Sequence, residues 1–365
     1  MTEKARPRAR SWRRWLWLGA GLLISAVFLW LSLRGLHLEQ VWRDIQSANY
    51  IWIVPGVAVY FLAVWFRTWR WHYQLRLLKP VPTRRLWPAV AIGYMGNNIY
   101  PFRAGEVIRC YVLYRDEQIN MPASLATVLV ERIFDGLTML IFVFAALPFA
   151  LSEIVDQAGS AWLIQVSVVA TVVFFLALIV FLYLAIRPER AACVYCWLID
   201  RFVPAPMRAR TREIADRFMG GLVALRSPRD MLMILFTSIL VWLTETLKYW
   251  FVMHAFPFET SFFVLMLMTA VVNLATTIPS APGYIGTFDG PGIATLAAFG
   301  VDANVAASYT LVLHAALWLP ITVLGAWYFV RKGMRWADFD RAQAAAAKLA
   351  DEEPPSETTP ATVEL

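Results

Sequence analysis

The chain has 365 residues, of which 59% are hydrophobic and only 16% are charged, and its formal net charge is +7. Soluble globular domains carry about 45–50% apolar and about 25% charged residues, so this composition excludes an ordinary cytosolic enzyme, a disordered chain and, with three cysteines, a disulfide scaffold. The basic residues lie between long apolar runs, a pattern that is typical of a membrane protein and argues against nucleic acid as a partner.

Six apolar stretches are long enough to cross a bilayer as helices, which takes roughly 20 residues each. Two further apolar stretches, 86–114 and 262–300, are interrupted by Asn, Pro and Gly. The sequence therefore predicts an all-α, polytopic helical membrane protein with six full spans and two re-entrant helical hairpins, eight hydrophobic segments in total. The six spans are 15–33, 50–66, 124–150, 161–186, 231–254 and 304–330.

Lysine and arginine predict the orientation of these spans, because cytosolic loops of membrane proteins are enriched in both. Most of the 33 basic residues fall in segments that alternation of the spans places on one side, namely 1–14, 67–85, 103–115, 187–229 and 331–348. We therefore expect a multi-pass protein of the plasma (inner) membrane with both termini in the cytosol.

The same order of segments predicts the domain organisation. Residues 1–14 form a basic cytosolic N-terminus, 15–330 a single transmembrane domain, and 331–365 a cytosolic, partly disordered tail. Each half, 15–150 and 161–330, runs span, span, hairpin, span, and the halves start on opposite sides, which is the plan of an inverted repeat. Cytosolic elbow helices are expected at 187–229, where apolar residues recur at helical spacing between arginines.

The two interruptions predict a polar interior, because backbone that is not helical at membrane depth must be enclosed by protein or line a water-filled cavity. Half-helices are expected to begin near Ala104 and Pro291, and their positive dipole ends favour an anion. The residues that break the helices are Asn97, Asn98, Pro101 and Gly105 in the first hairpin, and Pro282, Gly283, Tyr284 and Gly286 in the second.

Charged residues near the first break are candidates for a lipid-phosphate site. Arg103, Arg109 and Arg132 can hold a phosphate, since a guanidinium group forms a bidentate fork. Glu106 lies three residues from Arg109 on one helical face, so a simple pair between them is an equal alternative.

Other charges inside apolar runs are candidates for proton coupling or for a charge network that joins helices, because intramembrane charges need partners. The charged cluster of Glu131, Arg132 and Asp135 in the third span either joins this helix to the first hairpin or acts on the substrate or a proton. Asp289 either caps the following half-helix or carries a proton, and Asn273 lies nearby. Besides Glu106, these candidates are Glu131, Asp135, Glu245, Lys248, Asp289 and His314, of which Glu245 and Lys248 are expected to pair.

The remaining motifs say little about function. Cys193 and Cys196 form a lone CxxC without a second pair, so we expect no metal and no cofactor. The sequence has no phosphate-binding Gly-Lys-Ser/Thr loop, so no ATPase is built in.

Three of the segments above resemble, in order, the signatures of the lysylphosphatidylglycerol synthase transmembrane-region family, which is often labelled flippase-like. The residues 101–109 are similar to its P-x-R-x-G-E-x-x-R pattern, 131–135 to its E-R-x-x-D segment, and 282–289 to its P-G-G-x-G-x-x-E pattern. The likeness covers roughly residues 15–330. Tyr284 stands where the family has glycine, Asp289 where it has glutamate, and His314 where it often has arginine.

This resemblance implies a lipid-translocation domain, 15–330, without the soluble synthase domain. We expect a transporter, a flippase or scramblase that moves an anionic or phosphate-bearing lipid such as a phospholipid, and not an enzyme. Coupling to protons or ions and oligomerisation are left open, as is the identity of the lipid. Two alternatives remain: a membrane enzyme on lipid-linked substrates, such as a polyprenyl-phosphate glycosyltransferase, and an assembly partner in lipid biosynthesis.

Overall fold

The computed structural model describes residues 22–30, 32–76, 78–100, 103–158, 161–186, 228–278 and 280–339, together with isolated positions at 19, between 196 and 212, and at 341. The predicted elbow segment 187–229 and most of the tail 331–365 lie largely outside the described residues. Pro101 and Cys193 also lie outside them.

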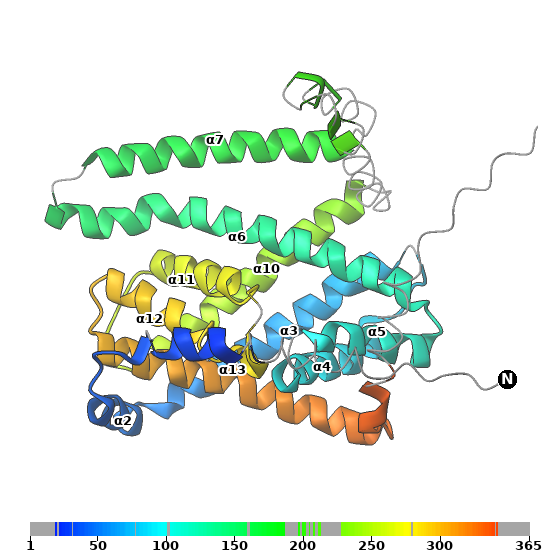
Figure 1. Cartoon of the computed structure of the whole chain (residues 1–365), viewed down its shortest axis with the longest axis horizontal. Coiled ribbons are helices and arrows are strands. Elements are labelled where there is room, and N and C mark those ends of the chain that lie inside the picture. Colours follow the sequence, from blue (N-terminus) through cyan, green and yellow to red (C-terminus); the bar gives the residue numbers. More distant parts are fainter. Residues whose placement is uncertain are drawn as a thin grey trace, which may run out of the picture.

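All regular elements of the described part are helices (Figure 1). Residues 22–30 and 32–33 are helical and belong to the first predicted span. The other elements, in chain order, are α2 (Leu38–Ser47), η1 (Tyr50–Trp52), α3 (Ile53–Leu75), α4 (Thr83–Ile99), α5 (Ala104–Glu117), α6 (Met121–Ala158), α7 (Ala161–Ile186), α10 (Pro228–Met253), α11 (Phe262–Ala275), η3 (Pro282–Tyr284), α12 (Asp289–Ala298) and α13 (Ala303–Arg331).

Four helices of the described part are long and apolar enough to cross a membrane. They are Tyr50–Leu75, Met121–Ser152, Arg229–Met253 and Ala303–Arg331. The predicted span 161–186 is one continuous helix, α7, and it is apolar all round. The prediction of an all-helical, multi-pass membrane protein is therefore confirmed, whereas the number of six full spans stays a prediction.

The second span is longer than the sequence predicts, because its helix does not end at residue 66. Residues 67–75 were expected in a cytosolic loop, but α3 continues to Leu75. Arg67 and Arg70 therefore lie inside a transmembrane helix, where they are 8% and 0% exposed. The run remains helical because these arginines find carboxylates on neighbouring helices.

Both interrupted stretches form pairs of short helices. The first, α4 and α5, has 17 and 14 residues, and the second, α11 and α12, has 14 and 10. Each is shorter than the roughly 20 residues that a full crossing needs. The re-entrant path of the hairpins stays a prediction, since the structure contains no membrane.

The break positions differ in detail from the sequence prediction. Asn97 and Asn98 belong to the last turn of α4, which ends at Ile99, and Gly105 is the second residue of α5, which begins at Ala104. The second half-helix begins at Asp289, two residues before Pro291.

The helices pack in the same pattern in both halves. In the middle, α3 packs along α10. Hairpin helix α4 packs on α13, the last span of the other half, and α11 likewise packs on α6. Within each half the second hairpin helix contacts the span that follows it, α5 with α6 and α12 with α13. Helix α7 lies at the edge of the molecule, against α6 (Figure 1).

Glycines allow the two helices of the first hairpin to approach closely, as small residues do in membrane helix pairs. A Cβ atom on Gly105 would lie 1.8 Å from the Gly93 carbonyl oxygen and 2.6 Å from the Asn97 amide nitrogen. Gly96 fits against the same glycine, since its Cβ would lie 2.8 Å from Gly105 Cα. The backbone of α5 therefore lies directly on the backbone of α4.

We predict that Gly105→Ala destabilises the protein by about 3 kcal/mol, the upper end of the usual cost of overpacking, because backbone atoms are the obstacle. Thermal unfolding of the purified protein in detergent measures the loss. The matched control is Gly136→Ala in α6, where nothing lies within 4 Å of the added methyl group. Equal unfolding midpoints for the two variants would contradict the close packing.

Candidate functional site

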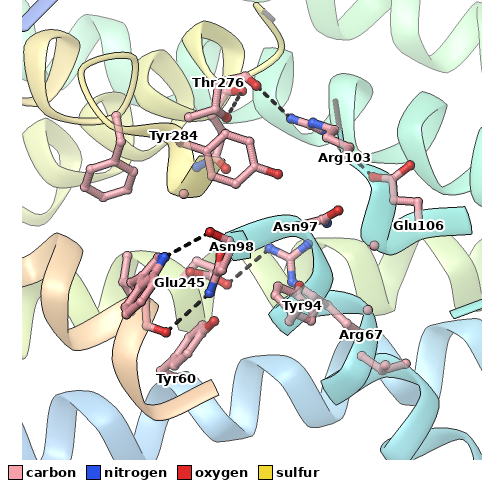
Figure 2. Close-up of a pocket in the computed structure, with 18 of the residues that line it drawn as sticks. Tyr60, Arg67, Tyr94, Asn97, Asn98, Arg103, Glu106, Glu245, Thr276 and Tyr284 are labelled. Atoms are coloured by element: carbon pink, nitrogen blue, oxygen red, sulfur yellow. Dashed lines mark hydrogen bonds and ion pairs between the residues drawn. The ribbon is translucent and has the colours of Figure 1, made fainter. Parts of the chain in front are cut away.

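The two helix breaks line one cavity. Asn97, Asn98 and Arg103 reach it from the first hairpin, and Gly283 and Tyr284 from the second (Figure 2). The space is about 990 Å³ when the open solvent at its mouth is included, and α3, α6, α10 and α13 complete the wall. Segments at least 180 residues apart in the chain thus line a common chamber, as the interrupted helices predict.

Side chains at the breaks connect the two hairpins directly. The Arg103 Nη2 group donates a hydrogen bond to the Thr276 carbonyl oxygen at 3.1 Å, and the guanidinium lies 5.7 Å from the centre of the Tyr284 ring. Trp318 of α13 donates to the Asn98 carbonyl oxygen at 3.4 Å. Arg103 and Tyr284 both have positive φ, 52° and 62°, a conformation that L-residues with side chains rarely adopt. The glycine that the resemblance leads us to expect at position 284 would meet this requirement without strain.

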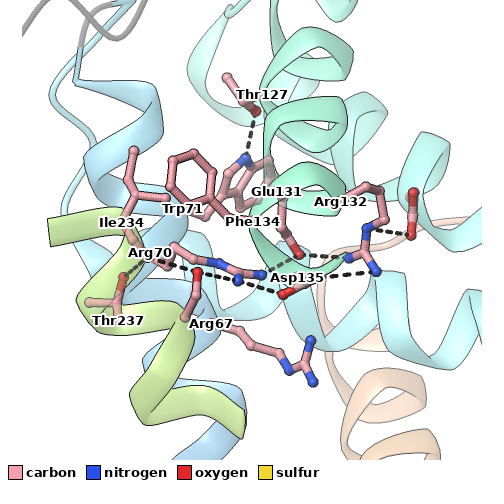
Figure 3. A network of polar contacts seen from close by, with 12 residues as sticks. Arg67, Arg70, Trp71, Thr127, Glu131, Arg132, Phe134, Asp135, Ile234 and Thr237 are labelled. Atoms are coloured by element: carbon pink, nitrogen blue, oxygen red, sulfur yellow. Dashed lines mark hydrogen bonds and ion pairs between the residues drawn. The ribbon is translucent and has the colours of Figure 1, made fainter. Parts of the chain in front are cut away.

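A buried ion network holds three helices together behind the cavity (Figure 3). The Arg70 guanidinium of α3 contacts Asp135 at 2.6 Å and Glu131 at 3.0 Å, both on α6. It also donates to the Ser238 hydroxyl of α10 at 2.8 Å. The Trp242 indole of α10 donates to Asp135 at 2.9 Å. Each charge thus has several polar partners, which is the condition for burying it.

The same carboxylates face the first hairpin. Arg109 of α5 contacts Glu131 at 2.9 Å, and Arg132 contacts Glu131 at 2.8 Å, Asp135 at 3.3 Å and Glu106 at 3.5 Å. The alternative pair of Glu106 with Arg109 does not form: Glu106 lies between Arg103 and Arg132, and Arg109 contacts Glu131 of α6. The cluster does join α6 to the first hairpin, whereas its role toward a substrate stays a prediction.

A second ion network adjoins the first, and Trp242 contacts members of both. Arg67 of α3 contacts Glu245 of α10 at 3.1 Å. Glu245 also pairs with Lys248, three residues further along the same helix, as the sequence indicates. The Lys248 ammonium lies 4.5 Å from the centre of the Tyr60 ring, and the Arg67 guanidinium lies 4.5 Å from that of Trp242. Cations and aromatic rings thus alternate along this wall.

Asp289 and His314 connect the second hairpin to α13. The Asp289 side chain does not cap α12, because Phe288 occupies the N-cap position and Asp289 is the first helical residue. One Asp289 oxygen accepts a hydrogen bond from the Gly286 amide at 2.9 Å, and the other lies 2.7 Å from His314 Nδ1. His314 Nε2 lies 2.7 Å from the Gly283 carbonyl oxygen. His314 is therefore an interior histidine with both ring nitrogens hydrogen-bonded.

Two other residues that the sequence analysis names lie apart from the ion networks. Asn273 lines the cavity and donates to the Thr269 carbonyl oxygen at 2.7 Å. Cys196 is a free, half-buried cysteine within the predicted elbow segment, and its CxxC partner lies outside the described residues.

Sequence reasoning missed Arg67 and Arg70. The signal was present, because aromatic residues continue past the predicted end of the span, in Phe66, Trp69 and Trp71 around the two arginines. Their spacing of three residues places them on one helical face, as with Glu245 and Lys248.

We predict that Arg70→Gln lowers stability by about 3–5 kcal/mol, because two buried carboxylates lose their shared counter-charge. Arg76→Gln is the matched control on the same helix. Its ion pair with Asp230 is 3.5 Å long and its side chain is 47% exposed, so removing it should cost no more than about 1 kcal/mol. Detergent thermal unfolding compares the variants, and similar midpoints would show that the Arg70 network does not stabilise the bundle.

Comparison with known proteins identifies relatives that are distant but extensive. A UPF0104 membrane protein of Methanothermobacter thermautotrophicus is 23% identical over 77% of this chain and 85% of its own length. A UPF0104 membrane protein of Methanocaldococcus jannaschii is 20% identical over 83% of this chain and 91% of its own. Glycosyltransferase AglD of Haloferax volcanii is 25% identical over 84% of this chain and 53% of its own. No solved structure matches the chain.

The relative in Haloferax volcanii corrects one sequence-based expectation. We expected a protein that is not an enzyme, and this is contradicted by a relative that carries the name of a glycosyltransferase and matches most of the chain. The names of the UPF0104 relatives state no activity.

The family resemblance that the three sequence segments indicate is confirmed. The model of the lysylphosphatidylglycerol synthase transmembrane region matches residues 18–325, and the chain belongs to this family.

Proposed function

We propose that this membrane protein carries a lipid with a phosphate-bearing headgroup from one face of the bilayer to the other. The observation that supports this most directly is the shared cavity, in which two broken helices and two ion networks meet inside a bundle of apolar helices. A headgroup can leave the polar surface of the membrane only if a polar chamber replaces the water that it loses.

The chemistry of the cavity suits a phosphate. Arg103 and Arg109 line it from the first hairpin, and guanidinium groups bind phosphate oxygens in pairs. Arg67 adds a third guanidinium from α3. Arg132 is already shared among three carboxylates, so it supplies positive charge more than free donors.

Exposed apolar side chains beside both breaks favour a lipid over a soluble anion. Ile99 follows Asn98 and is 39% exposed, and Ile285 follows Tyr284 and is 49% exposed. Ile278 and Trp318, near Thr276 and Asn98 respectively, are also exposed. Acyl chains can stay against this surface while the headgroup enters the cavity.

The packing of the two halves suggests how the cavity changes sides. Each hairpin packs on the last span of the other half, so a rocking movement of the halves would open the chamber to one face and close it to the other, as in transporters built from inverted repeats. We place both termini in the cytosol and the protein in the inner membrane. The lipid gradient or a proton gradient would drive transport, and the hydrogen-bonded pair of Asp289 and His314 is the proton site that we favour.

Replacing one guanidinium tests this function. We predict that Arg109→Lys slows lipid movement in proteoliposomes at least tenfold, because an ammonium keeps the charge beside Glu131 but loses the fork that holds two oxygens. Fluorescently labelled phospholipid with a dithionite quench measures the rate. Arg85→Gln, whose side chain is 69% exposed outside the cavity, should retain it. Wild-type rates in a folded Arg109→Lys protein would remove Arg109 from the mechanism.

The name of the Haloferax volcanii relative favours a second candidate, glycosyl transfer to a lipid-linked phosphate. The cavity residues would then hold the lipid phosphate during the reaction. Incubating the purified protein with radiolabelled sugar nucleotides and a polyprenyl phosphate tests this. A labelled lipid product that is lost in Arg109→Lys would support it, and lipid movement without any labelled product would speak against it.

A further inference from the structure

The charges around the cavity do not balance. Among the described residues, the cavity wall and the ion pairs directly behind it contain more basic than acidic side chains (Figures 2 and 3). The basic ones are Arg67, Arg70, Arg103, Arg109, Arg132 and Lys248; the carboxylates are Glu106, Glu131, Asp135 and Glu245. Each basic side chain contacts at least one carboxylate, but the carboxylates are shared, and the six basic and four acidic groups sum to a net charge of +2.

The pair of Asp289 and His314 does not change this balance. The Gly283 carbonyl oxygen can only accept, so His314 Nε2, 2.7 Å away, carries a proton. A second proton lies between His314 Nδ1 and the Asp289 oxygen, also 2.7 Å apart. The pair is neutral whether that proton belongs to the imidazole or to the carboxyl group. The excess of two positive charges thus remains.

Much of this positive charge is buried, although the Arg103 and Arg132 side chains are 26% and 33% exposed. Arg67 and Arg109 are 8% and 6% exposed, and Lys248 is 3% exposed. The Nε atoms of both arginines are buried and have no hydrogen-bond partner in the described part of the chain. Buried charge and unused donors are both costly, and an anion that accepts several hydrogen bonds would satisfy them together.

We infer that the cavity is matched to a dianionic headgroup, a lipid that ends in a phosphate monoester. This inference rests on the proposed function and names its substrate class. A phosphate monoester carries a charge of about −1.5 to −2 at neutral pH and three acceptor oxygens. A phosphodiester headgroup, as in phosphatidylglycerol, carries one negative charge and leaves the set with a net charge of +1.

Basic residues reach the cavity from two groups of helices. Arg103 and Arg109 approach from the first hairpin, whereas Arg67 and Lys248 approach from α3 and α10. Their carboxylate partners differ as well, since Glu131 contacts Arg109 and Glu245 contacts Arg67 and Lys248. A phosphate held between the two groups would accept hydrogen bonds from both.

Binding of two lipids with the same acyl chains tests the inference. The purified protein in phosphatidylcholine nanodiscs is titrated with dioleoyl phosphatidic acid or dioleoyl phosphatidylglycerol, and retained lipid is measured by native mass spectrometry. We expect phosphatidic acid to bind at least tenfold more tightly, because one further unit of charge interacts with the excess positive charge. Soluble glycerol phosphate, which has the same dianionic group without chains, should bind far more weakly.

Two variants that change the charge of the cavity in opposite directions test the same inference. Lys248→Gln removes one excess charge and should reduce the preference for phosphatidic acid to about threefold or less. Glu106→Gln adds one and should increase the preference; its side chain is 18% exposed, so the change is tolerated more easily. Arg85→Gln, outside the cavity, should match the wild type. If Lys248→Gln does not fold, the direction of the Glu106→Gln effect decides the question.

Equal affinity for the two lipids, or a Glu106→Gln preference that does not rise, would overturn the dianionic headgroup and leave the carrier function standing. Binding of neither lipid would contradict both proposals. Glycerol phosphate that binds as tightly as phosphatidic acid would support the dianionic site and contradict a lipid as its ligand.

Discussion

The cost of placing charge inside an apolar helix bundle determines how this protein is built. Arg70 is fully buried and is tolerated only because Glu131 and Asp135 of α6 and Ser238 of α10 surround it. This requirement fixes the rotation of α3, α6 and α10 about their own axes, since each must present its polar residues to the same point. The wall of the cavity is a consequence, because Arg109 approaches Glu131 from the first hairpin and Arg132 of α6 contacts both carboxylates beside it.

The two halves use one packing plan with different polar links. In the first half, Arg109 of α5 binds Glu131 of the following span. In the second, Asp289 of α12 binds His314 of the following span. Both links join the second hairpin helix to its neighbour, but one is an ion pair and the other a hydrogen bond between a carboxyl group and an imidazole. The close glycine packing of Gly93, Gly96 and Gly105 is found in the first hairpin.

Local patterns in the sequence located the elements well and their partners poorly. The apolar runs predicted the long helices, and the clusters of Asn, Pro and Gly predicted both breaks to within a few residues. The pair of Glu245 and Lys248 was predictable because both lie on one helix. The pair of Glu106 with Arg109, predicted by the same rule, does not form, because Glu131 on another helix offers Arg109 a better-buried partner.

The sequence by itself determined that the chain is a helical membrane protein, where its helices are interrupted and which charges lie in apolar surroundings, because these properties follow from hydropathy and spacing along the chain. Only the tertiary structure decided that both breaks face one cavity, that Arg67 and Arg70 belong to its charge networks and that the positive charges outnumber the carboxylates. These properties depend on which helices meet, and no local pattern of residues encodes the distance between helices that are far apart in the chain.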